Sequence, residues 1–201
     1  MPDKMNRTVD VAIAGRSYKQ RTEVEGNNSA GTSPTLAAAK TGSLTTRTDA
    51  NTGTLTMAGG HGIQTGDKLD VYWADGVRYN MTVGSVAANS VPIDGGAGDS
   101  LPSASTAITA MVPNDEVAAA AGDDVVAIVA SSPAKGVVCF LDGSNAVLFA
   151  APFRDAAGGT FDWATGDLLT NPLAGVTVAK IRTSHGDSTA ARTVTGRLLY
   201  N

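Results

Sequence analysis

The stretch Gly59–Ile93, GGHGIQTGDKLDVYWADGVRYNMTVGSVAANSVPI, decides the fold. On both sides of Asp75-Gly76, apolar residues alternate with polar ones at a period of two, which is typical of strands and not of helices. The alternating apolar positions are Leu69, Val71 and Trp73 before the turn, and Val77, Tyr79, Met81 and Val83 after it. The stretch therefore predicts a β-meander.

The turn at Asp75-Gly76 determines which residues of the first hairpin lie opposite each other. A two-residue loop would set Trp73 opposite Arg78, whereas a three-residue loop over 74–76 sets apolar residues opposite apolar ones. Since a slip of one residue sends every side chain to the other face, we predict the three-residue loop, with Gly76 in the left-handed conformation. The expected pairs are Trp73 with Val77, Val71 with Tyr79, and Leu69 with Met81.

The strands around this hairpin predict a closed β unit. A second turn at Asn89-Ser90 is expected to set Val86 opposite Ile93. Two similar Thr-rich segments, 41–46 and 52–57, predict a hairpin before the meander, and Thr106–Val112 can return as a closing strand. About six short strands over residues 41–112 indicate a small barrel or roll, which removes the exposed edges of an open sheet.

A second β unit is predicted beyond Pro113-Asn114-Asp115. Its strands are apolar on both faces, as expected inside a sandwich. They are Val125–Ala130, Val137–Leu141 and Ala146–Phe153, followed by 176–183 and 192–200. The alanine-rich segment Glu116–Ala121 is expected to form at most one or two helical turns. Phe161 and Trp163, within a loop over 154–175, are expected to anchor the packing.

The first part of the chain predicts an arm. Val9, Val11 and Ile13 alternate with polar residues, and a second alternation after Gly15 indicates an N-terminal hairpin. Residues 26–35, GNNSAGTSPT, have little to bury, so we expect a loop or an arm that becomes ordered only against a partner. Residues 36–40 are compatible with a helical turn or with extended chain.

The predicted fold is therefore all-β: a small β-barrel or roll followed by a β-sandwich-like unit, with an extended N-terminal arm. The expected divisions are an N-terminal hairpin and arm over 1–40, the barrel over 41–113 and the sandwich over 114–201.

Composition excludes several classes of function. The chain of 201 residues is 42% apolar and 17% charged, which suits a soluble globular protein. Its net charge of −4 gives no basic surface for phosphate backbones, so nucleic acid is not an expected partner. No signal-peptide or membrane-spanning pattern is present, so we expect no membrane partner. Cys139, the only cysteine, lies in an apolar run and is expected to be a buried small hydrophobe.

No catalytic residue, cofactor or metal site is predicted. His61 and His185 each lie in a glycine-rich turn. A hydrolytic triad of His185, Asp187 and a serine lacks the G-x-S-x-G element, and the spacings of histidine and cysteine that bind zinc are missing. The loops that contain Asp94, Asp99 and Asp142 are only loosely similar to calcium loops, because D-x-D-x-D-G with a trailing glutamate does not occur.

Aromatic residues of the meander offer one binding hypothesis. In the predicted register Trp73 faces the core, whereas Tyr72 faces the other way with Asp70. A surface pair of Tyr72 and Arg78 would provide a glycan contact, as in a carbohydrate-binding adhesion module.

The style of the whole chain resembles virion structural proteins of tailed bacteriophages. The resemblance lies in small β modules and in turns rich in Thr, Gly and Ala, such as LTTRTDANTGTLTM (44–57) and SVAANSVPIDGG (85–96). It implies a non-enzymatic virion subunit that is made in the bacterial host cytoplasm, forms homo-oligomers and contacts major capsid or tail proteins. A capsid decoration or stabilisation subunit is the first expectation, and a tail tube or fibre subunit is the alternative.

Overall fold

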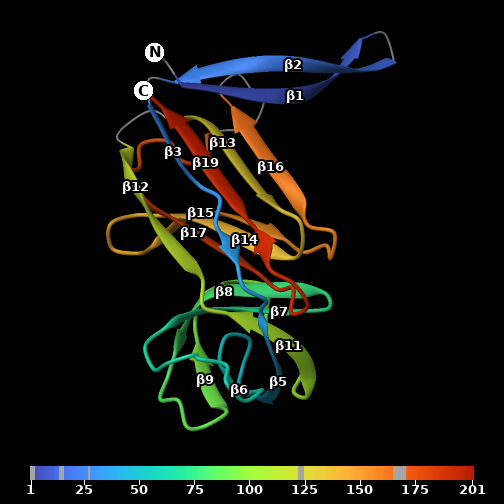
Figure 1. The fold of residues 1–201 in the computed structure, drawn as a ribbon, viewed down its shortest axis with the longest axis vertical. Helices are drawn as coiled ribbons and strands as arrows, with labels where there is room; N and C mark the ends of the chain where they lie inside the picture. Colours follow the sequence, from blue (N-terminus) through green and yellow to red (C-terminus); the bar gives the residue numbers. More distant parts are fainter. Residues whose placement is uncertain (1–2, 14–15, 27, 122–124, 165–170) are drawn as a thin grey trace.

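The computed structural model describes residues 3–13, 16–26, 28–121, 125–164 and 171–201. Every regular element in these ranges is a strand (Figure 1). The strands form a closed barrel, a sandwich of two sheets and a separate hairpin. The predicted all-β class, with a barrel, a sandwich-like unit and an extended N-terminal arm, is confirmed.

The barrel consists of six strands joined in the order β8-β7-β11-β5-β6-β9, and β9 pairs back to β8. The strands are β5 (Lys40–Arg47), β6 (Gly53–Met57), β7 (Lys68–Trp73), β8 (Gly76–Val83), β9 (Ser90–Asp94) and β11 (Thr106–Met111); short β10 (Ala97–Gly98) adds to β8. Its core contains Leu44, Leu55, Leu69, Met81 and Ile93. The Thr-rich hairpin and the closing strand are therefore confirmed.

Of the three pairs predicted for the first meander hairpin, only one is correct, and Gly76 does not take the predicted left-handed conformation. Leu69 lies opposite Met81 as expected, but Trp73 lies opposite Gly76, so the loop has two residues, 74–75. The difference is a β-bulge at Asn80, which has a φ of 59°. The bulge is held because the Asn80 N–H donates to the Asp70 carboxylate. At the tip, the Trp73 ring occupies the space that a Cβ on Gly76 would need.

The predicted pairing around the second turn is wrong. Val83, and not Val86, lies opposite Ile93, and the turn is closed by a bridge between Ala87 and Ser90. Beyond Val83 the Gly84 N–H still donates to the Pro92 carbonyl, whereas the Val86 N–H donates to the hydroxyl of Thr65.

The sandwich consists of two four-stranded sheets, β12-β17-β14-β15 and β16-β13-β19-β3. The first holds β12 (Asn114–Ala121), β17 (Val178–His185), β14 (Gly136–Leu141) and β15 (Val147–Phe153); the second holds β16 (Gly159–Ala164), β13 (Val125–Ser132), β19 (Thr195–Tyr200) and β3 (Asn28–Thr32). Ile128, Phe140, Ile181 and Leu198 pack between the sheets. Trp163 is buried in this core and Phe161 packs against the same core, and both belong to strand β16 and not to a loop.

Two segments that were not expected to be strands are strands. Residues 116–121 lie in β12 and not in helical turns, because pairing with β17 outweighs the modest helix preference of alanine. Residues 28–32, which were expected to become ordered only against a partner, form strand β3 against β19 of the same chain. Main-chain hydrogen bonds make this edge strand possible despite its polar sequence, and Ala30 packs against the sandwich core. Beyond it, β4 (Thr35–Leu36) pairs with β18 (Arg192–Thr193), so residues 35–36 are extended.

The N-terminal hairpin is confirmed. Its strands β1 (Asp3–Ile13) and β2 (Arg16–Gly26) pair from Asp3 opposite Gly26 to Ile13 opposite Arg16. Figure 1 shows this ribbon at the end of the sandwich that is remote from the barrel. It pairs with no other described strand.

The sheet that contains β14 lies between two other layers. Val138 and Phe140 point into the sandwich core, whereas Val137, Cys139 and Leu141 pack with Tyr72 and Val77 of the barrel. This explains why every residue of β14 is buried and why its sequence is apolar on both faces. The barrel is thus packed on the outer face of the sandwich.

Gly196 provides a test of the sandwich packing. A Cβ at this position would lie 2.7 Å from side-chain atoms of both Ile181 and Val138. We expect Gly196→Ala to reduce the free energy of unfolding by about 1–3 kcal/mol, because the sheets would have to move apart. Urea unfolding measures this. Gly143→Ala is the matched control, since its Cβ would meet nothing within 4 Å. An equal effect of the two substitutions would contradict the close approach.

Candidate functional site

The junction between the barrel and the sandwich holds most of the buried polar side chains of the described chain. Strand β7 contributes Asp70 and Tyr72, and β17 contributes Arg182, Ser184 and His185. Asp70 and Tyr72 face away from the barrel core, as the alternation predicts, but this face is covered by the sandwich. Trp73 is partly buried and packs against the barrel core.

Asp70 and Tyr72 meet at one hydroxyl group. The Ser184 hydroxyl donates to Asp70 Oδ2 and lies 2.6 Å from the Tyr72 hydroxyl. The Asn80 N–H donates to the other oxygen of Asp70 at 2.7 Å. Asp70 is only 1% exposed, and this burial raises its pKa to about 6. Burial also raises the pKa of Tyr72, so its hydroxyl stays protonated.

Arg182 joins three strands beside this cluster. Its guanidinium donates to both oxygens of Asp115 on β12 and, at 2.6 Å, to the side-chain oxygen of Asn80 on β8. The Arg182 side chain is 5% exposed and that of Asp115 is 32% exposed, so this ion pair is partly shielded from solvent. Through these hydrogen bonds the guanidinium links β17 to β12 and to the barrel.

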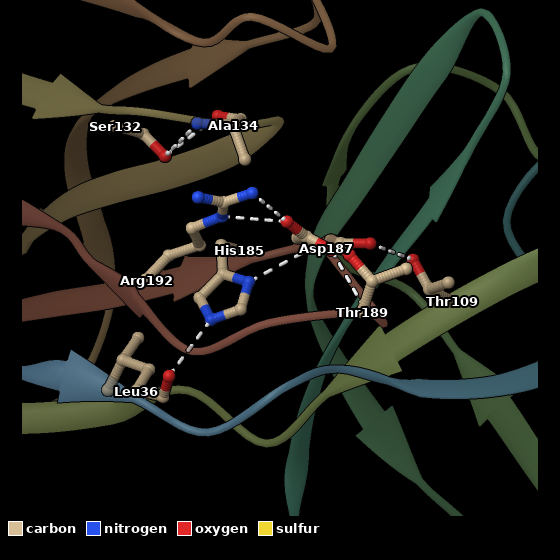
Figure 2. Close-up of polar contacts among 9 residues, drawn as sticks. Leu36, Thr109, Ser132, Ala134, His185, Asp187, Thr189 and Arg192 are labelled. Atoms are coloured by element: carbon tan, nitrogen blue, oxygen red, sulfur yellow. Dashed lines mark hydrogen bonds and ion pairs between the residues drawn. The ribbon is translucent and has the colours of Figure 1, made fainter.

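The loop after β17 connects the same layers through its backbone (Figure 2). The Gly186 carbonyl accepts the Thr109 hydroxyl of the barrel at 2.7 Å. The Asp187 carbonyl accepts the Ala39 N–H at 2.8 Å, and the Gly186 N–H donates to the Lys135 carbonyl at 2.9 Å. One short loop thereby fixes the segment before β5, strand β11 and the sandwich.

His185 has a structural environment. Its Nε2 lies 3.3 Å from the Leu36 carbonyl, and its Nδ1 accepts the Asp187 N–H at 3.2 Å. Burial lowers the pKa of His185, which favours the neutral ring. The Asp187 carboxylate bonds instead with Thr189 and Arg192 (Figure 2). Asp187 therefore does not orient the ring through its carboxylate, as a triad requires.

The other candidate residues are placed apart. His61 bonds with the Ala88 carbonyl and with the Ile63 N–H. The Asp142 carboxylate closes its own turn by accepting two backbone N–H groups. Asp99 binds Arg154, and Asp94 accepts a long contact from Thr52. In the described ranges, no three His, Cys, Asp or Glu side chains gather in a way that could hold a metal ion.

Tyr72 and Arg78 do not form the exposed pair that the glycan hypothesis requires. Tyr72 is 1% exposed beneath the sandwich, and Arg78 is 7% exposed. The Arg78 guanidinium donates to the carbonyl oxygens of Gly95, Gly96 and Asp99, so it fixes the loop over 95–99. The alternation correctly separates the two faces of β7, but it does not reveal that a second module covers the outer one.

A hollow of about 350 Å³ lies at the edge of the junction. Lys135 lines it together with Tyr72, Trp73, Thr109 and Gly186. The Lys135 ammonium donates to the carbonyl oxygens of Trp73 and Ala74, which caps the tip of the first meander hairpin. This lysine therefore also acts between the modules.

Reasoning from the sequence missed Arg182 and Ser184 as junction residues. They lie in a run of four consecutive polar residues, 182–185, at the end of β17, so no alternation with apolar residues marks the face that meets the barrel. Cys139 is fully buried in this interface, as the sequence predicts.

No family model, curated protein or solved structure matches the chain. No helix in the described part of the chain is long and apolar enough to cross a membrane.

Tyr72 tests the polar contact at the junction. We expect Tyr72→Phe to reduce the free energy of unfolding by about 1 kcal/mol, because the ring stays packed while its hydrogen bond to Ser184 is lost. Denaturant unfolding at pH 7 measures the change. Tyr79→Phe is the control, since the half-buried Tyr79 packs at the margin of the same cluster and its hydroxyl bonds no described residue. A smaller effect at Tyr72 than at Tyr79 would contradict the role of the bond.

Proposed function

We propose that the protein is a non-enzymatic structural subunit of a tailed-bacteriophage particle, present in many copies and acting as a capsid decoration or stabilisation protein. The observation that carries the proposal is the β1–β2 ribbon, which pairs with no other described strand. It is joined through β3 to a body whose two modules are tied by buried polar contacts.

The ribbon has the properties of an assembly arm. Two strands of eleven residues each form it, and it lies against β13 and β19 of the sandwich without joining their sheet. A two-stranded hairpin is on its own at best marginally stable in water, so a ribbon with only this limited support has little to stabilise it within the chain. Its backbone register sets Met5 opposite Val24 and Val11 opposite Tyr18. At other positions an apolar residue lies opposite a polar one, as for Val9 with Gln20 and Ile13 with Arg16. A neighbouring subunit is the surface that would complete such an element.

The body supports the same role. Its buried charged groups contact each other or backbone groups, as the Arg182 pair and the carbonyl contacts of Arg78 show. A subunit used in many copies needs a body that keeps its shape while its arm and edges make contacts. The expected partners are further copies of the chain and the major capsid protein. A tail tube or fibre subunit would use the ribbon in the same manner.

Removal of the ribbon tests the proposal. Deletion of residues 1–26 leaves β3 in place, and we expect a folded protein that no longer forms oligomers or binds particles. Light scattering coupled to size-exclusion chromatography and electron microscopy of particles would measure both properties. Circular dichroism verifies the fold. Unchanged assembly and particle binding by the truncated chain would refute the proposal.

A longer deletion is the matched comparison. Removal of residues 1–35 also takes away β3, which exposes the edge of β19 and the side chains that pack on Ala30. We expect this chain to be less stable than the chain that lacks residues 1–26, by thermal unfolding. Loss of assembly in the shorter deletion can therefore be assigned to the ribbon.

A further inference from the structure

Asp70 is the carboxylate that the two modules enclose when they dock. It is 1% exposed, and its oxygens accept from the Ser184 hydroxyl of the sandwich and the Asn80 N–H of the barrel. An ionised carboxylate in such a place keeps only part of the stabilisation that water would give it. When the barrel separates from the sandwich, Asp70 regains water. Its ionisation and the docking are therefore linked.

The groups that face Asp70 leave its charge without a direct ion pair. Tyr72 lies on the same strand, Cys139 on β14 and Asp115 on β12, and ionisation of any of these groups would add negative charge. Arg182 on β17 is the cation in the cluster, but its hydrogen bonds go to Asp115 and Asn80. The two hydrogen bonds favour the ionised carboxylate, but burial disfavours it more strongly. The neutral carboxyl group can keep both contacts, because its O–H can donate to the Ser184 hydroxyl while the other oxygen accepts the Asn80 N–H. Docking therefore favours the protonated form.

We propose that this junction is a proton-controlled latch, in which protonation of Asp70 tightens the docking of the barrel on the sandwich and ionisation loosens it. The inference concerns the docking of the two modules alone and does not depend on the proposed assembly role.

The direction and size of the effect follow from linkage. The pKa of Asp70 is raised from 3.8 to about 6 in the docked state. The contribution of Asp70 to docking is full below pH 3.8 and is lost as the pH rises through about 6. A group whose pKa is higher in the docked state changes the equilibrium constant for opening of the junction by up to tenfold for each pH unit between its two pKa values. Between pH 4.5 and 7.5 we therefore expect this constant to increase roughly 10- to 30-fold.

His185 titrates in the opposite sense. Burial lowers its pKa, so its neutral form stabilises the fold above the ordinary value of 6.5 and this contribution is lost on acidification. Its ring nitrogens bond with the carbonyl of Leu36, in β4, and with the N–H of Asp187, in the loop after β17. A comparison of the protein with Asp70→Asn, which retains His185, separates the two contributions.

Cys139 reports directly on the latch. It is the only cysteine, it is fully buried, and its side chain packs in the cluster with Tyr72 at the junction. A thiol reagent can reach it only when the barrel moves away or the chain unfolds. The two routes differ in urea dependence, because opening of the junction exposes less surface than global unfolding.

The experiment follows the labelling of Cys139 by 4,4′-dithiodipyridine in the full chain at pH 4.5 to 7.5. Each rate is divided by that of the urea-denatured chain at the same pH, which removes the titration of the thiol itself. We expect protection to fall roughly 10- to 30-fold as the pH rises, with a weak urea dependence. In Asp70→Asn this fall should be absent. Asp99→Asn, which removes a surface carboxylate from the contact with Arg154, should keep it.

Two results would overturn the latch: a pH profile of protection shared by Asp70→Asn and the unaltered protein, or labelling that occurs only through global unfolding. Should Asp70→Asn not fold, a ¹³C NMR titration of the aspartate carboxyl groups in the unaltered protein decides the matter. An aspartate with a midpoint near 6 that also shifts the resonances of the Tyr72 ring supports the latch. Midpoints below 5 for every aspartate would refute it.

Discussion

The burial of both faces of one sheet is the constraint on which the rest of the structure depends. Strands β14 and β17 pack on the sandwich core with one face; with the other, β14 packs on the barrel and β17 forms hydrogen bonds to it. Side chains on the face toward the barrel are buried between the two modules. This face holds Val137, Cys139 and Leu141 on β14, which pack against apolar residues, and Arg182 and Ser184 on β17, which form hydrogen bonds. The barrel is accordingly a third layer of the body and not a loosely attached module.

The strands whose apolar residues alternate, or which are apolar throughout, could be predicted from the sequence. Alternation indicated the strands of the barrel and the sandwich, and the faces of β7 were separated correctly because a period of two fixes them. Pattern does not state what covers a face, so the expected surface position of Tyr72 is wrong and the sandwich encloses this side chain. The bulge at Asn80 depends on a single backbone bond to Asp70, which no turn rule contains.

Two errors share another cause, which is pairing between segments far apart in the chain. Residues 28–32 lack apolar content, and 116–121 favour helix by composition, yet both are strands because an edge partner is available. The polar junction was invisible for the same reason, since Ser184 and Asp70 are 114 positions apart. The absence of catalytic histidines stays a prediction from motif, to which the structure adds that backbone groups bond both rings.

The pairing of β3 with β19 also sets an order of events during synthesis. The barrel is built from a contiguous stretch, so it can close once residue 111 has left the ribosome. The sheet that contains β3 cannot be completed before β19 is made, and the paired residues of these strands are 164 to 172 positions apart in the chain. Contacts of such high sequence separation form slowly. During synthesis the chain therefore has a folded barrel and a sandwich that still lacks strands. In this state chaperones could bind the exposed sheet, or two chains could associate prematurely.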